Sequence, residues 1–554
     1  MQSAEEQIAE LKAALAAAEE RAAALAAERD RLREAYQQLK LELELLKRRL
    51  YVAKAERIDT TQLELELGGK LAELDALARR LAGEAADPAP AAPPASDRTK
   101  RTKKPRGRRD LREADLPEES IEIVDPELEG KADRIGFEES CAIGWRRPTP
   151  VRVIIRRAKY RTKDPSGPQT ASAPPPPALI RRGLALPSML AHIASDKFCD
   201  GLPLYRQEDR FARAGFRIDR GTMCRWLEEL GGAVGATIVE AMRKEALASA
   251  FCIATDATGV LVQPIKDAQV RQPARRCHYL VQIADRDHVF FEFLERETSA
   301  TIGELFKGYS GYVLADAKSV YDLLYRPPDD GTAAEVRVEV GCWSHGRRKF
   351  WEAAIAKDLV AREALLRIKR IFDADRALRD HTAEERTRLR NVHVRIYVES
   401  FLDWAAERYE EVKDRRGSLR AALGYVVRQR NALARFLDDG RLPMTNNHAE
   451  RENRRVAVGR KAWLFVGSDD HGRAAGNLLT LIASARLHGL DPEAYLRDIF
   501  RVLPHWPAGR YLELAPKYWL ATRARLDPAQ LAAHLGPLDV PPPSDSPAEQ
   551  TASH

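Results

Sequence analysis

The sequence has few cysteines and no long apolar run, and each absence excludes a class of protein. Its six cysteines are scattered over 554 residues, without a C-x-x-C pair or the regular spacing of a disulfide framework. No stretch reaches the roughly 18 apolar residues that a bilayer span needs. The N-terminus opens with an acidic amphipathic segment rather than a basic and apolar signal. We therefore expect a cytoplasmic protein with reduced thiols and no membrane partner.

Length and charge indicate several domains and one strongly basic segment. One hydrophobic core does not extend over such a length, so we expect roughly three to five compact units. The net charge of +7 is modest, but residues 98–109 hold eight Lys or Arg in twelve and no acid. Cations at this density bind phosphate backbones through counterion release, without sequence choice. A solubilising linker is the alternative.

Apolar residues recur at alternating spacings of three and four between Ile8 and Leu50, and only Arg29 interrupts them. Glu, Lys and Arg occupy the flanking positions, which is the pattern of helices that wind around each other. We expect a coiled coil that makes the chain a homo-oligomer. The alternative is a single helix packed on its own domain.

Residues 185–235 are expected to be helical, with the spacing of a helix-turn-helix motif. Gly215 sits where a turn would follow the first helix, and Asp219 can cap the second. In such a motif Arg220 and Arg225 would lie on or near the exposed end that enters a major groove of DNA. Two helices that simply pack together at a glycine are the alternative.

From residue 249 the periodicity changes to short runs rich in Val, Ile, Phe and Tyr, separated by polar turns. A helix is expected at about residues 300–307, then further strands and a helix from about Ser344. This order predicts a mixed sheet covered by helices. Residues 357–440 have helical periodicity and almost no Gly or Pro, so they form a helical block.

Three acids in this region are candidate metal ligands. Asp256 closes the run FCIATD and Asp316 closes YVLAD, so we expect each carboxylate to leave the sheet at a strand end. Glu450 lies in TNNHAERENRR, at a helix start that Asn446 or Asn447 can cap. Carboxylates from separate elements can hold two magnesium or manganese ions for phosphoryl transfer.

Several long motifs resemble the insertion sequence 66 family of transposases. They are NNHAERENRRVAVGRKAWLFVGS with the following HGRAAGNLLTLIASARLHGLDPEAYLRDIF, the earlier GCWSHGRRKFWEA, and KFCDGLPLYRQEDRFARAGFRIDRGTMCRW. LLKRRLYVAKAERID and GRRDLREADLPE fit as well, so that the resemblance covers nearly the whole chain up to about residue 505.

The resemblance implies a DDE-type enzyme on a ribonuclease H-like fold, with a helical insertion before the last acid. Carried over by position, the family's acids fall on Asp256, Asp316 and Glu450. His345 is implied to lie near the core with Arg347 and Arg348, as supports or DNA contacts; a helix cap and a solvated face are the alternative.

This chain also departs from the family's pattern. Ala257, Ala317, Lys318 and Thr445 replace residues that usually neighbour the acids, which puts full activity in doubt. Two Cys pairs are usual between about residues 125 and 170, whereas only Cys141 is present. A tetrahedral zinc site needs about four Cys or His ligands, so we predict no zinc and a block that folds by packing or on DNA.

The predicted fold class is multidomain: an N-terminal α coiled coil, a small helical DNA-binding region and an α/β ribonuclease H-like core with a mixed sheet and a helical insertion. The expected parts are the coiled coil 1–83, a disordered Ala/Pro and then basic linker 84–110, the cysteine-poor block 111–170, the helix-turn-helix region 185–235, the core 248–356, the insertion 357–440, the core's last part 441–505 and a tail 506–554 with a disordered end.

The predicted function is metal-dependent cleavage and strand transfer at the ends of an insertion sequence. Its partners would be double-stranded DNA at element ends, target DNA and small accessory proteins encoded by the same element, with the protein on the nucleoid when bound. A DNA-binding relic that no longer cuts, or a metal-dependent DNA nuclease, is the alternative. The expected DNA-binding residues are Arg98, Lys100, Arg101, Lys103, Lys104, Arg106, Arg108, Arg109, Arg220, Arg225, Arg347, Arg348, Arg451, Arg454, Arg455, Arg460 and Lys461.

Overall fold

The protein divides into two compact units in a computed structural model. The model describes residues 118–129, 133–146, 149–161, 170–180, 183–264, 273–326 and 336–543, with a few positions before residue 71. One unit, here the helical unit, comprises Met1–Pro105, His345–Asp380 and Leu389–Arg428. The other, here the sheet unit, comprises Arg106–Ser344, His381–Arg388 and Gln429–His554. Most of the predicted coiled coil and the basic segment 98–109 lie outside the described residues.

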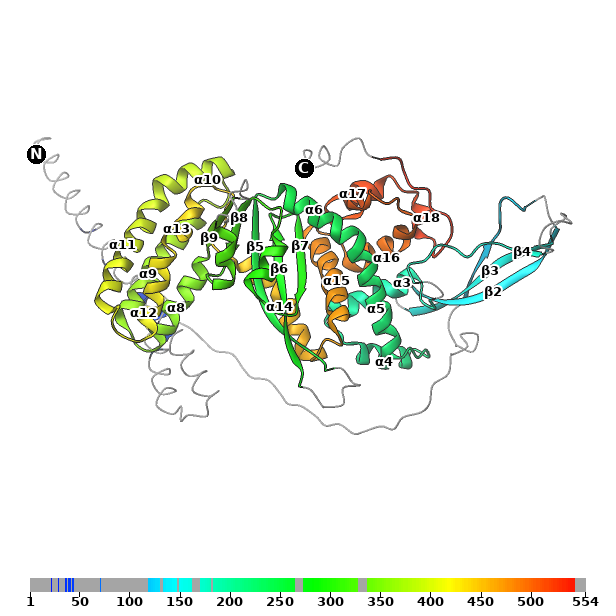
Figure 1. Ribbon diagram of the computed structural model, residues 1–554, viewed down its shortest axis with the longest axis horizontal. Helices are drawn as coiled ribbons and strands as arrows, with labels where there is room; N and C mark the ends of the chain where they lie inside the picture. Colours follow the sequence, from blue (N-terminus) through cyan, green and yellow to red (C-terminus); the bar gives the residue numbers. More distant parts are fainter. Residues whose placement is uncertain are drawn as a thin grey trace, which may run out of the picture. The chain divides into compact units, whose positions relative to one another are not determined.

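A five-stranded mixed sheet forms the centre of the sheet unit, as the sequence predicts (Figure 1). Its strands are β5 (Cys252–Val262), β6 (Arg275–Ala284), β7 (His288–Leu294), β8 (Gly311–Ala315) and β9 (Arg337–Gly341). They lie in the order β7-β6-β5-β8-β9, with β5, β6 and β7 antiparallel and β8 and β9 parallel to β5.

The prediction that a strand ends at Asp256 is wrong. Residues on either side of Asp256 form the single strand β5 and not two strands, so Asp256 lies within the strand instead of closing it. The reason is β6, which pairs with β5 without interruption through Asp256↔Val281 and on to Val262↔Arg275. A polar stretch can remain extended when a neighbouring strand satisfies its backbone groups.

Helix α15 (Asp469–Leu487) packs between the sheet and helix α5 (Arg220–Val234), as Figure 1 shows. Two glycines permit the close approach on its two sides. A Cβ at Gly476 would lie 2.4 Å from the Phe291 carbonyl oxygen on β7, and one at Gly231 would lie 2.2 Å from the Ala474 carbonyl oxygen. Larger side chains at these positions would separate the layers.

The two helices and the turn expected between residues 185 and 235 are present, and that they form a DNA-binding helix-turn-helix stays a prediction. Helices α3 (Pro187–Phe198) and α4 (Leu204–Arg213) precede α5. Gly215 has a φ of +81°, which suits the turn after α4, and the Asp219 carboxylate accepts a 2.8 Å hydrogen bond from the Gly221 amide. After α5 come η2 (Gly235–Val239) and α6 (Glu240–Ser249).

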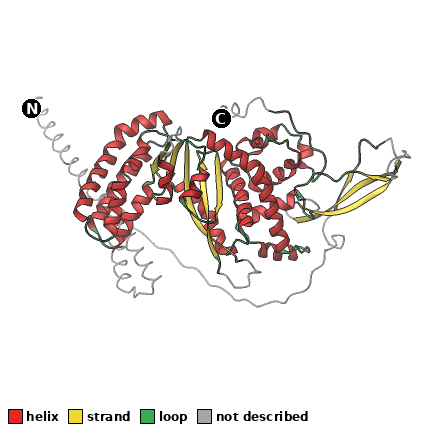
Figure 2. Cartoon of the chain, in the orientation of Figure 1, coloured by secondary structure: helices red, strands yellow, loops and turns green. Residues whose placement is uncertain are grey.

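The segment that lacks the family's cysteine pairs folds as a second, small sheet, drawn as long strands in Figure 2. Its strands are β1 (Glu118–Ile123), β2 (Asp133–Arg146), β3 (Thr149–Arg161) and β4 (Thr170–Ser172), with β3 between β1 and β2 and paired also with β4. Val151 and Val153 are buried beside Leu535 from the C-terminal region. Apolar packing therefore contributes a core to this block.

The remaining helices of the sheet unit extend the core beyond residue 505. They are α7 (Ser299–Leu305), η3 (Ser319–Tyr325), α13 (Arg430–Ala434), η5 (Arg435–Leu437), α14 (Asn447–Trp463), α16 (Pro492–Val502), η6 (Leu503–His505), η7 (Tyr511–Leu514), α17 (Pro516–Ala524) and α18 (Pro528–Ala532). Trp519 and Leu531 are buried in the same core as α5 and α15. The chain is predicted to be disordered from Pro541, but the structure describes residues 541–543, and Arg510 donates a 2.9 Å hydrogen bond to the Pro541 carbonyl oxygen. The rest of the predicted disordered end, from residue 544, lies outside the described residues.

The predicted helical block is present. Within residues 357–440 lie α9 (Leu359–Arg376), α10 (Ala383–Leu389), η4 (Arg390–Val394), α11 (Arg395–Val412) and α12 (Ser418–Arg428), followed by α13 and η5. Helix α8 (Trp343–Ile355) precedes this block, and residues 381–388 and 429–440 belong to the sheet unit. Leu39 and Leu43, two residues of the predicted coiled-coil seam, are buried, and Glu42 lies 3.4 Å from Arg362 of α9. These contacts within one chain are what a helix packed on its own domain would make, and the coiled coil stays a prediction.

Candidate active site

Asp256 and Asp316 lie at the same level on neighbouring parallel strands. The last paired residues of β5 and β8 are Ala254 and Leu314. Each aspartate comes two residues after the last residue that pairs β5 with β8, and side chains alternate between the faces of a strand with a period of two. The register therefore brings the two carboxylates to one edge region of the sheet, as expected for a shared ligand site.

Helix α14 packs along β5 beyond Ala254, where the pairing of β5 with β8 ends. At its start, the Asn446 side-chain amide donates a 2.6 Å hydrogen bond to the Thr255 carbonyl oxygen. Towards its end, Arg460 donates to the Gly259 carbonyl oxygen. Beyond the helix, Val466 forms a parallel bridge with Val262. Polar groups from the α14 region thus satisfy backbone atoms of β5 where the neighbouring strand has ended.

This arrangement ties the helix that carries Glu450 to the first aspartate. Asn453 Nδ2 donates a 2.8 Å hydrogen bond to Asp256 Oδ2. Glu450 lies in the first turn of α14 and three residues before Asn453, so the two side chains leave the helix on one face. Asn446 does occupy the N-cap position, but the expected cap is not made by its side chain, which bonds to β5 instead.

Cys342 and its neighbours connect β9 to the same helix start. The Asn446 backbone amide donates to Cys342 Sγ at 3.2 Å, and Ser344 Oγ lies 2.8 Å from Asn447 Oδ1. Cys342 Sγ also lies within 4.8 Å of a Glu450 carboxylate oxygen. The Cys-Trp-Ser segment therefore helps to position the turn that carries Glu450, a role that the sequence motif alone did not reveal.

Lys318 is a cation among the acids. Its Nζ lies 3.4 Å from Asp316 Oδ2 and 3.3 Å from Glu297 Oε1. Burial lowers the pKa of Lys318, but the charges of Asp316, Glu297 and Asp256 outweigh burial, and the net pKa is raised. The ammonium is therefore charged and partly neutralises this group of acids. Glu297 was not a candidate from the sequence, because it follows β7 and has no motif around it.

The donor atoms at this edge suit a hard divalent cation. Carboxylate and amide oxygens are ligands that magnesium and manganese accept. Besides the aspartates, Asn453 Oδ1 is buried and has no hydrogen-bond partner in the part of the chain that the structure describes. Within those described residues, the three carboxylates do not all lie within 4.8 Å of one another. Such spacing is compatible with acids that share two ions rather than one.

The cations that the sequence singled out have different surroundings. Arg451, Arg454 and Lys461 are exposed on α14, whereas Arg455 pairs with Glu452 at 2.5 Å and Arg460 bonds to β5. Arg220 is exposed at the start of α5, where the Arg225 guanidinium donates to Thr222 Oγ1 at 3.0 Å. Their contact with DNA stays a prediction.

Two further groups of residues were predicted from the sequence to lie near the core or to bind DNA. His345, Arg347 and Arg348 follow in α8 and belong to the helical unit, with both arginines exposed. Arg98, Lys100, Arg101, Lys103, Lys104, Arg106, Arg108 and Arg109 lie outside the described residues.

Comparison with known proteins identifies the family. The model of the Transposase IS66 family matches residues 182–474, and that of the IS66 C-terminal element matches residues 480–516. A third model, described as Transposase C of IS166 homeodomain, matches residues 38–121. This chain belongs to the IS66 transposase family.

Similar proteins from Sinorhizobium fredii carry no functional description. The chain is 28% identical to the uncharacterized protein y4qI, over 71% of this chain and 74% of that protein. It is 27% identical to the uncharacterized protein y4hP, over 68% of this chain and 69% of that protein. The IS66 match encloses Asp256, Asp316 and Glu450 together with the whole five-stranded sheet.

In this IS66 chain, two of the residues that depart from the expected pattern beside the acids, Lys318 and Ala257, have different surroundings. Lys318 is the one with a visible electrostatic consequence, since it pairs with Asp316. Ala257 follows Asp256 within β5 and contributes no polar group. Among the described residues, no helix is long and apolar enough to cross a membrane.

Proposed function

We propose that this IS66 protein is a DNA transposase of the DDE type, in which Asp256, Asp316 and Glu450 hold divalent metal ions on a ribonuclease H-like core. The observation that carries the proposal is the hydrogen bond from Asn453 to Asp256, made by the helix that also carries Glu450. With Asp316 level with Asp256 on the next strand, this bond supports a site to which all three acids contribute.

Each acid would have a separate task because each comes from a different element. Asp256 is held by Asn453, so its second carboxylate oxygen is left for a ligand. Asp316 follows the short strand β8, and Glu450 lies in the first turn of α14. When bound, magnesium or manganese would activate a water or a DNA 3′-hydroxyl and stabilise the leaving oxygen. Positioning and charge supply most of the acceleration in phosphoryl transfer.

The cations on α14 favour a phosphodiester as the substrate. Arg451 and Arg454 are exposed within one turn of Glu450. Guanidinium groups bind phosphate through paired hydrogen bonds. The family, with its homeodomain-like match at residues 38–121, suggests DNA binding. We propose that the partners are element ends and target DNA, with a homo-oligomer bringing two ends together and accessory proteins from the same element assisting.

A second candidate function is that of a DNA-binding relic with an impaired metal site. Lys318 favours it, because its ammonium already balances Asp316 and Glu297 and would oppose an incoming cation. A metal-dependent nuclease that hydrolyses DNA without joining it is the remaining alternative.

The test is cleavage and strand transfer on a labelled fragment that carries an end of the flanking element, with magnesium or manganese. The wild type should cut and join, and Glu450→Gln should do neither while DNA binding persists. Glu304→Gln is the matched control, since Glu304 is an exposed glutamate on α7 whose contact is with Lys307.

Each other outcome selects an alternative. Binding without cleavage in the wild type would favour the relic, and cleavage without joining would favour the nuclease. Cleavage that survives in Glu450→Gln would remove Glu450 from the site and overturn the three-acid proposal.

A further inference from the structure

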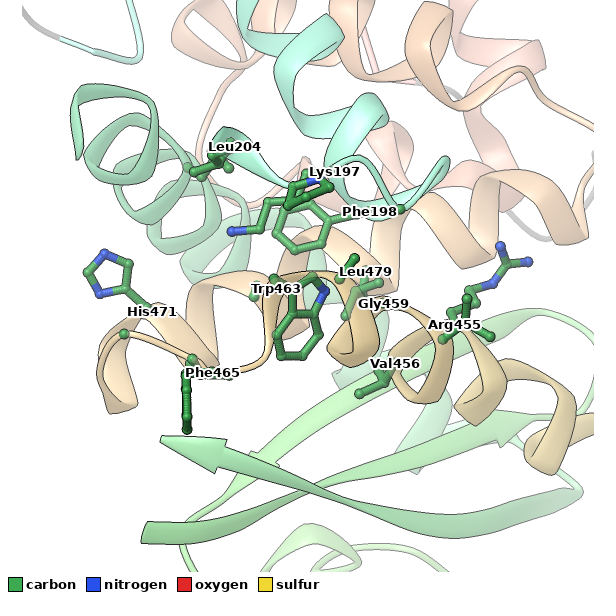
Figure 3. Close-up of a pocket in the computed structure, with 18 of the residues that line it drawn as sticks. Lys197, Phe198, Leu204, Arg455, Val456, Gly459, Trp463, Phe465, His471 and Leu479 are labelled. Carbon is green, nitrogen blue, oxygen red and sulfur yellow. The ribbon is translucent and has the colours of Figure 1, made fainter. Parts of the chain in front are cut away.

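A cavity of about 940 Å³ lies against helix α14, on the side of the helix that faces away from Asp256. Residues of α3, α4, α5, α14 and α15 line it, together with the loop 464–467. Figure 3 shows this cavity with Trp463 and Phe198 directed into it from opposite sides. All of these elements belong to the sheet unit. The volume is within the ~300–1,000 Å³ range of sites that hold small ligands.

Helix α14 contacts β5 with one face and lines the cavity with another. Asn446 and Asn453 bond to β5 on one face. Arg451, Arg455 and Trp463 line the cavity, each separated by a multiple of four residues, which is the spacing of a single helix face. A ligand in this cavity would therefore contact the helix that carries Glu450, without occupying the metal site.

The lining of the cavity has an excess of positive charge. Six Lys or Arg residues line it, against three Asp or Glu residues. Two of the acids are already paired, Glu452 with Arg455 and Glu228 with His471. In the part of the chain that the structure describes, the lining residues without a salt bridge include Lys197, Arg220, Arg451 and Arg454.

Among the lining residues, Lys197 gives the strongest indication of an anionic ligand. Its side chain is directed into the cavity in Figure 3, and its Nζ lies 5.1 Å from the centre of the Phe198 ring. Burial lowers the pKa of Lys197. A partly buried ammonium without a carboxylate is costly, and a bound phosphate would offset that cost.

The aromatic residues of the lining indicate that the ligand carries a nucleobase as well as a phosphate. Trp463, Phe198, Tyr205 and Phe465 line the cavity. The Trp463 indole lies against α14 itself, since a Cβ at Gly459 would come 2.7 Å from Trp463 Nε1. Leu464, between Trp463 at the end of α14 and Phe465, has a φ of +62°, a conformation that residues other than glycine seldom adopt. Strained backbone of this kind is concentrated at ligand sites.

We propose that this cavity receives one unpaired nucleotide of a DNA strand. Its base would stack on Trp463 and Phe198, and its flanking phosphates would meet Arg451, Arg454 and Lys197. Aromatic rings bind any nucleobase through stacking, and cations track the backbone. In a duplex the bases face one another in the stack, so only a nucleotide that has left the stack can use these rings. The inference rests on the proposed function for its role, but the binding needs no metal.

The test uses the full chain in EDTA and measures anisotropy of a labelled 12-nucleotide oligonucleotide, single-stranded or as a blunt duplex. Trp463→Leu should weaken binding of the single strand about tenfold, and Trp463→Phe should restore most of it. Duplex binding should change by less than twofold in both variants. Thermal melting of each variant excludes loss of the fold as the cause.

Two results would overturn the inference: unchanged binding of the single strand in Trp463→Leu, or equal weakening of single strand and duplex. The second would assign Trp463 to general backbone binding or to structure. Glu450→Gln separates this inference from the proposed function. It should bind the single strand like the wild type, so a failure of cleavage leaves this result standing, and a failure here leaves cleavage standing.

Discussion

At the scale of single residues, Lys318 is the charge that would most directly oppose a metal ion at the proposed site of Asp256, Asp316 and Glu450. Its ammonium lies within 3.4 Å of both Asp316 and Glu297 oxygens. Two unit charges ~4 Å apart near a protein surface interact by ~4 kcal/mol, and exposure to solvent reduces this value for a side chain that is 43% accessible. The lysine is therefore a competitor for any divalent cation at Asp316.

We expect Lys318→Gln to raise the affinity for manganese about tenfold, because the competing charge is removed. Titration of Mn²⁺ followed by electron paramagnetic resonance measures the affinity directly and does not depend on cleavage. Lys307→Gln is the control, since the exposed Lys307 ammonium lies 3.9 Å from Glu304 and pairs with neither Asp316 nor Glu297 among the described residues. An unchanged affinity in Lys318→Gln would mean that Asp316 does not bind the ion.

At the scale of elements, the contact between α5 and α15 depends on a glycine. A Cβ at Gly231 would lie 2.2 Å from the Ala474 carbonyl oxygen, whereas one at Gly232 in the same helix meets nothing within 4 Å. We expect Gly231→Ala to lower the free energy of unfolding by ~1–3 kcal/mol through overpacking. Gly232→Ala should raise it by up to ~1 kcal/mol through helix propensity.

Urea denaturation of the two alanine variants gives both free energies from the transition midpoints. The pair is matched, because the residue change and the helix are the same. Equal effects at Gly231 and Gly232 would contradict the close approach of α5 and α15.

Glu245 connects three elements through its carboxylate. It lies on α6, 2.6 Å from His288 Nε2 of β7, and also contacts Tyr518 and Lys517 of α17. Burial raises the pKa of Glu245, but the hydrogen bonds from His288 and Tyr518 outweigh it and bring the pKa to about 2. The Glu245 carboxyl group is thus ionised in the folded protein at all but the most acidic pH.

Because the folded pKa lies below the ordinary value of 4.5, the stabilisation is complete above pH 4.5 and is lost as the pH falls towards 2. We expect the urea midpoint of the wild type to fall over this interval, and that of Glu245→Gln to be lower at pH 7 and to change less with pH. A parallel pH dependence in both proteins would show that other groups govern acid unfolding.

At the scale of the whole molecule, the oligomeric state depends on which surface the N-terminal seam contacts. The seam pattern predicts self-association, whereas Leu39, Leu43 and Glu42 have contacts within their own unit. We expect the full chain to sediment as a dimer or larger, and the double variant Leu25→Asp, Leu32→Asp to sediment as a monomer.

The matched control for sedimentation is Ala24→Asp with Ala27→Asp, which adds the same charges outside the seam. A wild type that is monomeric at micromolar concentration would favour the helix packed on its own unit. Loss of the dimer in the control as well would assign the effect to charge rather than to the seam.

Local patterns alone determined much of this protein. The Asp219 cap, the turn at Gly215, the strands and the helical block follow from neighbouring residues, because capping, turn and periodicity are short-range properties. The strand pattern predicts Asp256 and Asp316, the polar helix start predicts Glu450, and the family's motifs predict all three acids. The position of Asp256 was the exception, since pairing with β6 carries β5 past it.

Only the tertiary structure decided what surrounds the acids. Asn453 reaches Asp256 across 197 positions of sequence, and Lys318 meets Glu297 because η3 packs against α7, the helix that follows Glu297. The cavity behind α14 likewise joins α3 to residues more than 250 positions later. Such contacts depend on how separate elements pack, and hydrophobic burial, which drives that packing, does not depend on distance along the chain.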